Sequence, residues 1–492
     1  MMRELNHIID QVPGILQAEG NLNLDISGIS YDSRQVKTGH LFIAVRGLIT
    51  DGHDYISTAI QSGATAIVYD RADVDIPAEI AAILVEDSRL ILPKIASSYF
   101  GHPEEGLKLL AITGTNGKTT TNYFVQHLLS SSGLKAGRIG TTGAQMTGVD
   151  IDLMHTTPES ADLYEILAEF VSHGAKAVTL EVSSHALAQN RVDGLSFDVA
   201  VYTNLTQDHL DYHGSLEDYL AAKQLLFKGL SKESVAIVNI DDPYAERIIE
   251  VCVAKIIRYG YNSDAEYHIL DHSINRHGVE LVLETPYGQR TVQVNTVGTF
   301  NYYNFLAAYT AAISMECDIE KIELSAKSLP VVPGRLEKMQ NKAPFHVFVD
   351  YAHTPDAVET VLETLKRSYP DQRILSVFGC GGDRDQSKRP IMGEIATRLS
   401  THAIITDDNP RSESPELILN QIAVGCANRD NFTIIQDRST AVLSALAKAR
   451  AGDVVAILGK GHEAYQEIMG ERYPYSDMII VNQFMEQHGY SA

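Results

Sequence analysis

The segment AITGTNGKTTT at residues 111–121 has the residue types of a phosphate-binding loop. A strand-like apolar run precedes it, and a run with apolar residues at helical spacing follows it, which is the context such a loop requires. Backbone N–H groups and the helix N-terminus would hold the anion, Lys118 would pair with terminal phosphates, and Thr119 could reach a magnesium ion. Ile112 stands where the usual pattern has its first glycine, so we expect a short loop variant. The loop predicts a nucleotide site but does not separate a hydrolase, a switch protein and a ligase.

Two further motifs place a carboxylate and an imidazole at the ends of strand-like runs. Glu181 lies in EVSSH and His209 in TNLTQDHLDYH. Side chains at neighbouring strand ends could share a magnesium ion with the phosphates, although imidazole is an unusual magnesium ligand. Either residue alone is more often a structural hydrogen-bonding group, and only their joint position beside the phosphate loop favours the metal site.

Lys223 is an anomaly in the helix-like segment GSLEDYLAAKQLLFKGL. Ser215 can cap this helix, and Lys223 falls in the middle of its apolar face. A lysine at the edge of such a face usually extends its ammonium to water. A buried ammonium tends to lose its charge, which frees the amine for chemistry. The residues alone therefore mark Lys223 as a candidate without giving its role.

Charged groups also follow the strand-like runs of the last third of the chain. Arg384 in GCGGDRD and Arg411 in DDNPRSE suit a carboxylate, while Asp408 and Glu463 could hold an ammonium. Any one of them is more often a solvated loop charge. Together they favour a site for a small zwitterion or for part of the nucleotide.

The elements that must position these residues form a repeating α/β pattern. Apolar β-branched runs end in polar loops and alternate with helical patterns, which predicts mostly parallel sheets whose loops converge at one edge. Length and the break at SLPVVPGRLE predict three α/β domains, at residues 1–88, 89–332 and 333–492. The expected strands are LLAITGTNGK, AKAVTLEVSSH, FDVAVYTNLTQDH, SVAIVNIDDP, HVFVDYAHTPD, ILSVFGCGGDRD, HAIITDDNPRSE and VVAILGKGHE.

Composition narrows the classes of protein. The net charge of −23 opposes nonspecific binding to nucleic acid or to an anionic membrane, so neither is an expected partner. We find no apolar run long enough to span a bilayer, and the first residues, MMRELNHIIDQVPGIL, lack the features of a signal peptide. These features predict a cytoplasmic protein, and we expect a monomer.

The motifs together resemble those of the Mur ligase family, the ATP-dependent amide-bond synthetases of bacterial cell-wall assembly. The resemblance covers essentially the whole chain. Its motifs are DSR, TGTNGKTT, HTTPE, EVSSHAL, TNLTQDHLDYH, the Lys223 helix, GTFNYYN, PGRLE, DYAHTP, GCGGDRD, DDNPR and GKGHE. Within DDNPR, the residues 408–411 match the signature loop of the diaminopimelate-adding members.

The resemblance implies an N-terminal domain for the uridine nucleotide, a central P-loop ATPase-like domain and a C-terminal Rossmann-like domain. It implies ligation of meso-diaminopimelate to UDP-N-acetylmuramoyl-L-alanyl-D-glutamate, with ATP and Mg²⁺. It assigns the uridine moiety to Tyr31, Ser33, Leu48, Ile49 and Thr50, and the muramoyl-dipeptide to His155, Thr156, Thr157, Ser183, Gln189 and Arg191. It assigns ATP to Gly114, Thr115, Asn116, Gly117, Lys118, Thr119, Thr120, Asn301, Asn304, Arg335 and Asp350. It assigns diaminopimelate to Arg384, Asp408, Asn409, Pro410, Arg411, Gly459 and Glu463.

The resemblance also implies a role for Lys223, because family members carry a carboxylated lysine at this position. With Thr119, Glu181 and His209 it would serve the metal, and these residues with Lys118 would be the catalytic group. Alternatives are a lysine-adding ligase of the same family, which the arginine in DNPR disfavours, and more remotely a folylpolyglutamate synthetase. A nucleotide-binding switch that ligates nothing would leave the C-terminal loops unused.

Overall fold

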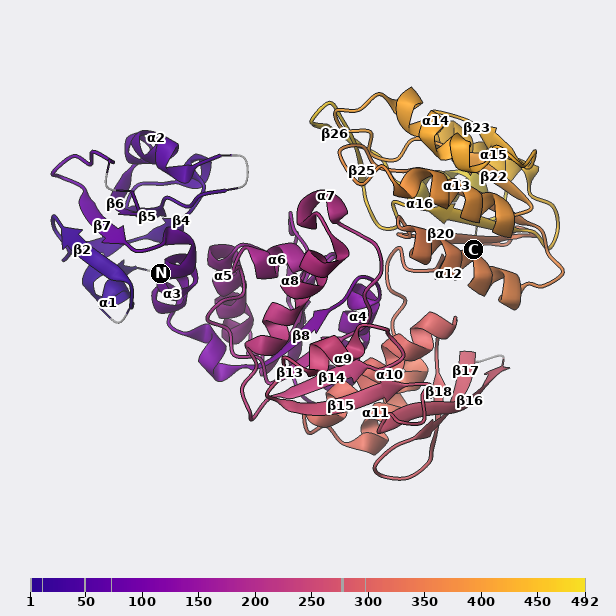
Figure 1. Ribbon diagram of the computed structural model, residues 1–492, viewed down its shortest axis with the longest axis horizontal. Coiled ribbons are helices and arrows are strands. Elements are labelled where there is room, and N and C mark those ends of the chain that lie inside the picture. The colour runs from indigo at the N-terminus through magenta and orange to yellow at the C-terminus, as the bar shows by residue number, and fades with distance from the viewer. Residues whose placement is uncertain are drawn as a thin grey trace.

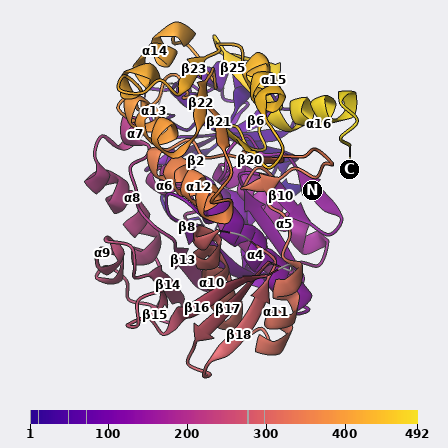
Figure 2. The same ribbon diagram turned by 90° about the vertical axis from the view of Figure 1, so that its right-hand side faces the viewer.

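The computed structural model describes residues 2–10, 12–47, 50–71, 73–275, 278–296 and 298–491. Three β-sheets, each built from a separate stretch of the chain, organise the molecule (Figure 1). The central sheet lies between the N-terminal and C-terminal sheets, and Figure 2 shows the C-terminal part above it. Among the described residues, no helix combines the length and apolar character needed to cross a lipid bilayer.

The N-terminal part is a five-stranded sheet of order β2-β7-β6-β5-β4, in which only β2 is antiparallel to its neighbour. Its strands are β2 (Ile15–Glu19), β4 (Gly28–Ser30), β5 (His40–Ile43), β6 (Ala64–Tyr69) and β7 (Ala81–Val85). A small pair, β1 (Arg3–Glu4) and β3 (Asp25–Ile26), lies beside it. Its helices are α1 (Leu5–Ile9), η1 (Ser33–Gln35), η2 (Gly52–Tyr55), α2 (Ile56–Gln61) and α3 (Ser88–Phe100). Because α3 contributes Leu92 and Ile95 to this core and also contacts the central part, it connects the two.

The central part is an eleven-stranded sheet of order β11-β10-β9-β12-β8-β13-β14-β15-β16-β17-β18. In this order across the sheet, the seven neighbouring strands β9, β12, β8, β13, β14, β15 and β16 are parallel. Antiparallel strands flank them on both sides. The strands are β8 (Lys108–Thr113), β9 (Ala136–Gly140), β10 (Gly143–Met146), β11 (Val149–Ile151), β12 (Ala177–Glu181), β13 (Val199–Tyr202), β14 (Val235–Asn239), β15 (Lys255–Gly260), β16 (Tyr267–Asn275), β17 (Gly278–Glu284) and β18 (Arg290–Val294).

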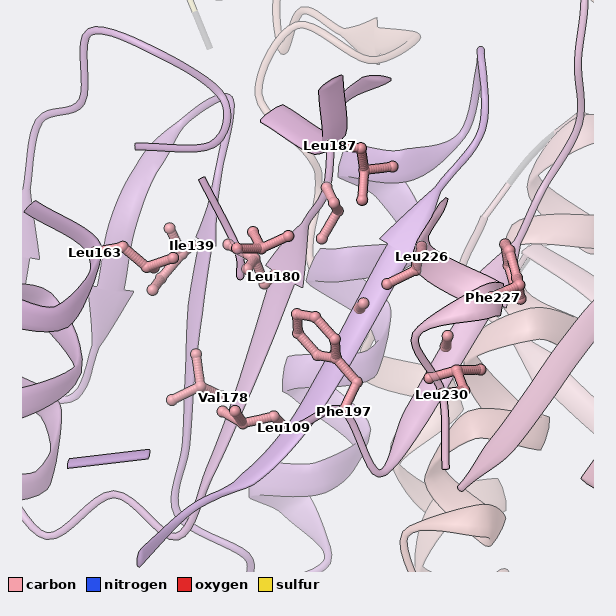
Figure 3. Close-up of a cluster of buried hydrophobic side chains, with 14 of the residues drawn as sticks. Leu109, Ile139, Leu163, Val178, Leu180, Leu187, Phe197, Leu226, Phe227 and Leu230 are labelled. Carbon is pink, nitrogen blue, oxygen red and sulfur yellow. The ribbon is translucent and has the colours of Figure 1, made fainter. Parts of the chain in front are cut away.

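Two apolar cores cover the two faces of this sheet. Leu109, Leu180 and Phe227 belong to the cluster on one face, part of which Figure 3 shows. Phe124 and Phe305 belong to the cluster on the other face. The helices of the first face are α5 (Ser160–Ser172), α6 (Ser184–Ala188), α8 (Leu216–Lys228) and α9 (Ala245–Ile249), and those of the second are α4 (Lys118–Ser131), α10 (Thr299–Ser314) and α11 (Ile319–Ser325). Three short helices are η3 (Pro103–Gly106), α7 (Leu210–His213) and η4 (Ala326–Ser328).

The C-terminal part is a six-stranded sheet of order β19-β20-β24-β21-β22-β23, parallel except for β19. Its strands are β19 (Glu337–Lys338), β20 (His346–Asp350), β21 (Ile374–Phe378), β22 (His402–Ile405), β23 (Phe432–Ile434) and β24 (Val454–Leu458). Its helices are α12 (Pro355–Ser368), α13 (Lys388–Leu399), α14 (Pro415–Gly425), α15 (Arg438–Lys448) and α16 (Asp477–Gln487). A separate hairpin of β25 (Tyr465–Ile468) and β26 (Glu471–Pro474) follows β24.

The predicted α/β class with three parts is confirmed, and each of the eight expected strands is present. The boundaries at residues 88/89 and 332/333 stay a prediction. The sequence analysis did not predict the antiparallel extension β16–β18 or the β25–β26 hairpin. Both are short-range pairings whose strands lack the apolar runs of the parallel strands.

Candidate active site

The phosphate loop occupies four residues, Gly114 to Gly117, between the end of β8 and the start of α4. Gly114 and Gly117 have φ angles of +149° and +88°, a region that side chains disfavour. A Cβ on Gly114 would overlap Thr203 Oγ1, and a Cβ on Gly117 would overlap Asn304 Oδ1. The short loop therefore lets other strand and helix ends approach its backbone closely.

Two lysine ammonium groups donate to the same carbonyl oxygen of this loop. Lys118 Nζ lies 2.9 Å from Gly114 O and 2.8 Å from Thr115 O, and Lys223 Nζ lies 2.8 Å from Gly114 O. Lys223 is only 1% exposed, as its position in the apolar face of α8 predicted. Burial lowers the pKa of Lys223 well below its ordinary value, and the Lys118 charge lowers it further. The structure thus favours a neutral amine at Lys223.

Glu181 is fully buried at the end of β12 and is surrounded by hydroxyl groups. Its Oε2 accepts from Thr119 Oγ1 at 2.9 Å and from Thr141 Oγ1 at 3.1 Å, and its Oε1 accepts from the Thr141 amide at 3.0 Å. Thr141 Oγ1 is also 3.1 Å from Thr156 Oγ1. Thr141, which the sequence analysis missed, therefore links the phosphate loop to the HTTPE segment.

His209 lies beside a second carboxylate that the sequence analysis missed. Asp208 is buried, accepts from the His209 amide at 2.9 Å and lies 3.4 Å from the His209 ring. Burial lowers the pKa of His209 to about 3, opposed by Asp208, so the ring is neutral at physiological pH. Burial alone would raise the pKa of Asp208, but interactions with His209, His353 and Lys388 bring it down to about 2. The His185 ring packs 4.8 Å from the His209 ring.

The oxygen atoms of Thr119 and Glu181 suit a magnesium ion, which binds proteins through one or two carboxylates together with substrate phosphates. Within the described ranges, no three His, Cys, Asp or Glu side chains gather as a complete metal-binding set. The protein atoms therefore fit a magnesium ion only in company with the phosphates and further oxygen ligands.

A cavity of about 250 Å³ lies between the central and C-terminal parts and is lined by Asn116, Asn304, Arg335 and Asp350. Arg335 donates to Thr119 Oγ1 at 3.1 Å and stacks 4.7 Å from the centre of the Tyr351 ring. Asp350 accepts from the amides of Leu336 and Ala352. Thr120 lines both this cavity and a second one of about 280 Å³, to which Asn301 contributes. The predicted nucleotide residues thus surround the hinge between the two parts.

The predicted muramoyl-dipeptide residues form a hydrogen-bonded group beside Glu181. Thr157 Oγ1 donates to Glu181 O at 2.8 Å and accepts from the Ser183 amide at 3.1 Å. Arg191 donates to Thr157 O at 2.9 Å and to Gln189 Oε1 at 2.8 Å. These five residues therefore position one another next to the phosphate loop.

Tyr31 and His155 line a cavity of about 680 Å³ between the N-terminal and central parts. Tyr31 donates to Asp162 Oδ2 at 2.6 Å, which with burial raises the pKa of the phenol. Ser33 is buried at the start of η1, and Thr50 O accepts from the Gly47 amide. Leu48 and Ile49 lie outside the described residues.

The predicted amino-acid residues meet at the carboxyl ends of β21, β22 and β24. Asn409 Nδ2 donates to Glu463 Oε2 at 3.1 Å. Asp408 is buried, and its Oδ2 lies so near Gly459 that a Cβ there would come within 2.6 Å. Arg411 and Pro410 complete the loop.

Arg411 is held by the β25–β26 hairpin. It has a left-handed φ of +50°, its amide donates to Glu467 O at 3.0 Å, and its Nε lies 3.4 Å from Glu467 Oε2. It also donates to Gly382 O at 2.7 Å. Arg384 points toward the central part, where its guanidinium is 4.0 Å from Asp211 Oδ2.

Besides the Arg384–Asp211 approach, further hydrogen bonds join the C-terminal part to the phosphate-loop side of the central part. They include Arg335 to Thr119 at 3.1 Å, Gln207 to Asp385 at 3.0 Å and Asn116 to Asp356 at 2.8 Å. The phosphate loop therefore faces the hinge, where the cavity of about 250 Å³ lies. This arrangement defines a three-part phosphate-loop protein of the α/β class.

Comparisons with known proteins narrow this class. Family models described as "Mur ligase family, catalytic domain", "Mur ligase middle domain" and "Mur ligase, glutamate ligase domain" match residues 25–100, 112–312 and 334–461. The chain is 41% identical, over 98% of its length and 99% of the relative's, to UDP-N-acetylmuramoyl-L-alanyl-D-glutamate–2,6-diaminopimelate ligase of Caldanaerobacter subterraneus subsp. tengcongensis. It is 39% identical to the ligase of the same name from Listeria monocytogenes, over 97% of both chains.

Solved structures agree with these relatives. A structure of a UDP-N-acetylmuramoyl-L-alanyl-D-glutamate–2,6-diaminopimelate ligase superposes with a TM-score of 0.69 at 32% identity, covering 100% of both chains. MurF ligase from Thermotoga maritima in complex with ADP, at 21% identity and a TM-score of 0.64 over 88% of this chain and 94% of that one, shares the fold. The protein belongs to the Mur ligase family.

Proposed function

We propose that the protein uses ATP to join meso-diaminopimelate to UDP-N-acetylmuramoyl-L-alanyl-D-glutamate in peptidoglycan precursor synthesis. The observation that carries the proposal is that the phosphate loop and the C-terminal part meet across one hinge, where Arg335 donates to Thr119 Oγ1 at 3.1 Å. The names of the full-length relatives support the choice of substrates. As part of the same proposal, the protein acts as a cytoplasmic monomer.

The reaction proceeds through an acyl phosphate. An oxygen of the D-glutamyl γ-carboxylate attacks the γ-phosphorus of ATP, and ADP leaves with the electrons of the broken P–O bond. An amine of diaminopimelate then attacks the acyl carbon, loses a proton and expels inorganic phosphate. Lys118 and the loop amides stabilise the charge on the phosphoryl group. Contacts across the hinge keep water from the acyl phosphate.

Lys223 is carboxylated in the active protein. Its neutral amine attacks carbon dioxide, forms an N–C bond and releases a proton, giving a carbamate. The site fits such an anion because Lys118 Nζ donates to the same oxygen, Gly114 O, as Lys223 Nζ. The carbamate, Glu181, Thr119 and His209 would hold Mg²⁺, which supplies charge neutralisation at the phosphates when bound.

The proposal extends to the substrate-binding residues, and the family resemblance supports these assignments. Arg191 and its partners Thr157, Ser183 and Gln189 orient the muramoyl-dipeptide, with Thr156 and His155 beside them. Tyr31, Ser33 and the segment 48–50 take the uridine nucleotide. Asp408 and Glu463 take an ammonium of diaminopimelate, and Arg384 and Arg411 orient its carboxylates.

Lysine addition by the same mechanism is the nearest alternative. Arg411 disfavours it, because lysine lacks the second carboxylate that this guanidinium suits. A folylpolyglutamate synthetase is more remote. The structural neighbour of that name, from Mycobacterium tuberculosis, matches 75% of this chain at 19% identity, which shows a shared fold alone.

The test measures phosphate release in the presence of ATP, Mg²⁺ and the UDP-muramoyl-dipeptide. The nucleotide product is identified by mass spectrometry. Diaminopimelate and lysine are added in turn. We expect phosphate release that depends on diaminopimelate and a product heavier by one diaminopimelate residue. Equal release with and without any amino acid would refute the ligase proposal, and a preference for lysine would refute the choice of amino acid.

A further inference from the structure

Lys460 is a fully buried lysine beneath the side chains of Asp408, Asn409 and Glu463, which form the proposed amino-acid pocket, and the sequence analysis gave it no role. It follows Gly459 at the end of β24 and is 0% exposed. Its Nζ donates to Asn409 Oδ1 at 2.9 Å and to Glu463 Oε2 at 2.9 Å. Both acceptors belong to side chains proposed to contact the amino-acid substrate.

Asn409 and Glu463 also contact each other, which closes a triangle with Lys460. Asn409 Nδ2 donates to Glu463 Oε2 at 3.1 Å, and the Glu467 amide donates to Asn409 Oδ1 at 2.9 Å. Glu463 Oε2 therefore accepts two hydrogen bonds from within the protein. Within the described ranges no side chain or amide bonds to Glu463 Oε1, so that oxygen is the one available to a substrate.

Asp408 presents a second available oxygen in the same pocket. Its Oδ2 is buried and has no hydrogen-bond partner in the described part of the chain, although Arg438 lies 3.9 Å away. Burial would raise the pKa of Asp408, but the charges of Lys460 and Arg438 hold it below its ordinary value. A buried carboxylate oxygen that accepts no hydrogen bond is costly, so a donor that reached Asp408 Oδ2 would stabilise it.

A buried lysine commonly serves only to satisfy nearby polar groups of the fold. That interpretation does not explain why both hydrogen bonds of Lys460 go to residues of the proposed amino-acid pocket, in which Asp408 Oδ2 accepts no hydrogen bond within the described part of the chain. A substrate ammonium between Glu463 Oε1 and Asp408 Oδ2 would complete both.

We propose that Lys460 is a positioning residue of the amino-acid pocket, whose ammonium fixes Asn409 and Glu463 so that Glu463 Oε1 and Asp408 Oδ2 together receive an ammonium group of the amino-acid substrate. The inference rests on the proposed function, because it takes this pocket to be the site of the amino acid. Lys460 does not touch the substrate and acts through Glu463.

The test replaces Lys460 with methionine, which keeps the length of the chain and removes the donors. We expect the KM for diaminopimelate to rise about tenfold, the equivalent of one hydrogen bond to a charged group, with the KM for ATP within about twofold of wild type. Lys460→Gln retains a neutral donor and is measured in parallel, so that a result exists if the methionine variant does not fold. We expect a smaller rise for it. An unchanged KM for diaminopimelate in either folded variant would overturn the inference.

A double-mutant cycle separates positioning from general loosening. In a Glu463→Gln background, Lys460→Met should raise the KM by less than about threefold, because the residue through which it acts is already altered. The same tenfold factor in both backgrounds would overturn the inference.

The matched control is Arg373→Met. It removes a 2.9 Å ion pair with Asp453. This pair lies at the amino-terminal ends of β21 and β24, whereas Lys460 follows the carboxyl end of β24. We expect a lower melting temperature and an unchanged KM, and a rise equal to that of Lys460→Met would overturn the inference. Failure of the proposed function is distinguishable, because the wild-type protein itself would then form no product with diaminopimelate.

Discussion

The ion pair between Arg438 and Asp477 offers a quantitative test of what holds the C-terminal part together. Both side chains are 0% exposed. Arg438 donates to the two carboxylate oxygens of Asp477 at 3.0 Å and 2.7 Å, and to Leu458 O, the last residue of β24, at 2.9 Å. The pair thus ties α15 and α16 to the strand that leads into the amino-acid pocket.

Replacing Arg438 with methionine leaves the Asp477 carboxylate buried with Tyr475, which donates to it at 2.7 Å. Removing one partner of a buried pair costs about 3–5 kcal/mol, because the remaining charge is uncompensated. For a unit of this size each kcal/mol shifts the melting temperature by about 2–4 °C, so the variant should melt about 6–20 °C lower. Arg438→Met combined with Asp477→Leu should recover most of the loss, since an apolar pair needs no desolvation.

The chain contains no tryptophan, so a single introduced one reports on its own surroundings. Tyr490→Trp, just after α16 and beside the ring of Phe345, gives a fluorescence probe of the C-terminal part. Urea unfolding is then followed in this background with and without Arg438→Met. A loss below about 1 kcal/mol, or a double variant no more stable than the single one, would refute the reasoning.

Three further outcomes are expected. Lys223→Ala should lower kcat by about 10²–10³-fold, with partial rescue by acetate or propionate, because it removes an anionic group beside the phosphates; unchanged turnover would contradict the carbamate. Gly114→Ala should abolish binding of a fluorescent ATP analogue because its Cβ overlaps Thr203, whereas Gly214→Ala, with a positive φ and open space, should bind normally. Glu467→Gln should reduce the ratio of kcat/KM for diaminopimelate over lysine by about two- to fivefold by releasing Arg411, and a constant ratio would show that the ion pair does not tune specificity.

Much of the fold and part of the site follow from local patterns. The β-branched runs predict the parallel strands because a strand buried on both faces needs apolar side chains at every position. Ser215 caps α8 by accepting from the Asp218 amide, as a serine just before a helix indicates. Lys223 is buried in the apolar face, as the helical period indicates. The polar loops meet because parallel strands end at one edge of a sheet.

The residues that the sequence analysis missed are defined by contacts between distant segments. Thr141 is one of many threonines, and only its bonds to Glu181, forty positions away, distinguish it. Asp208 adjoins a predicted residue, but its importance depends on its surroundings in space, where His209, His353 and Lys388 act on its carboxylate. Lys460 stands in a glycine-rich motif where a solvated lysine is the ordinary expectation. No periodicity reports which carbonyl or carboxylate a side chain meets.

The shared carbonyl of Gly114 explains why the helix of Lys223 and the phosphate loop must be considered together. Two ammonium groups that donate to one oxygen repel each other, and burial together with the Lys118 charge lowers the pKa of Lys223 well below its ordinary value. In the proposed function, Lys118 remains the cation for phosphate, while Lys223 acts as the nucleophilic amine that takes up carbon dioxide. Carboxylation would convert the repulsion into attraction and add an anion where a metal with the phosphates is expected. The lysine that interrupts the apolar stripe of α8 in the sequence thus has a defined partner in the structure, the carbonyl oxygen of Gly114 in the phosphate loop.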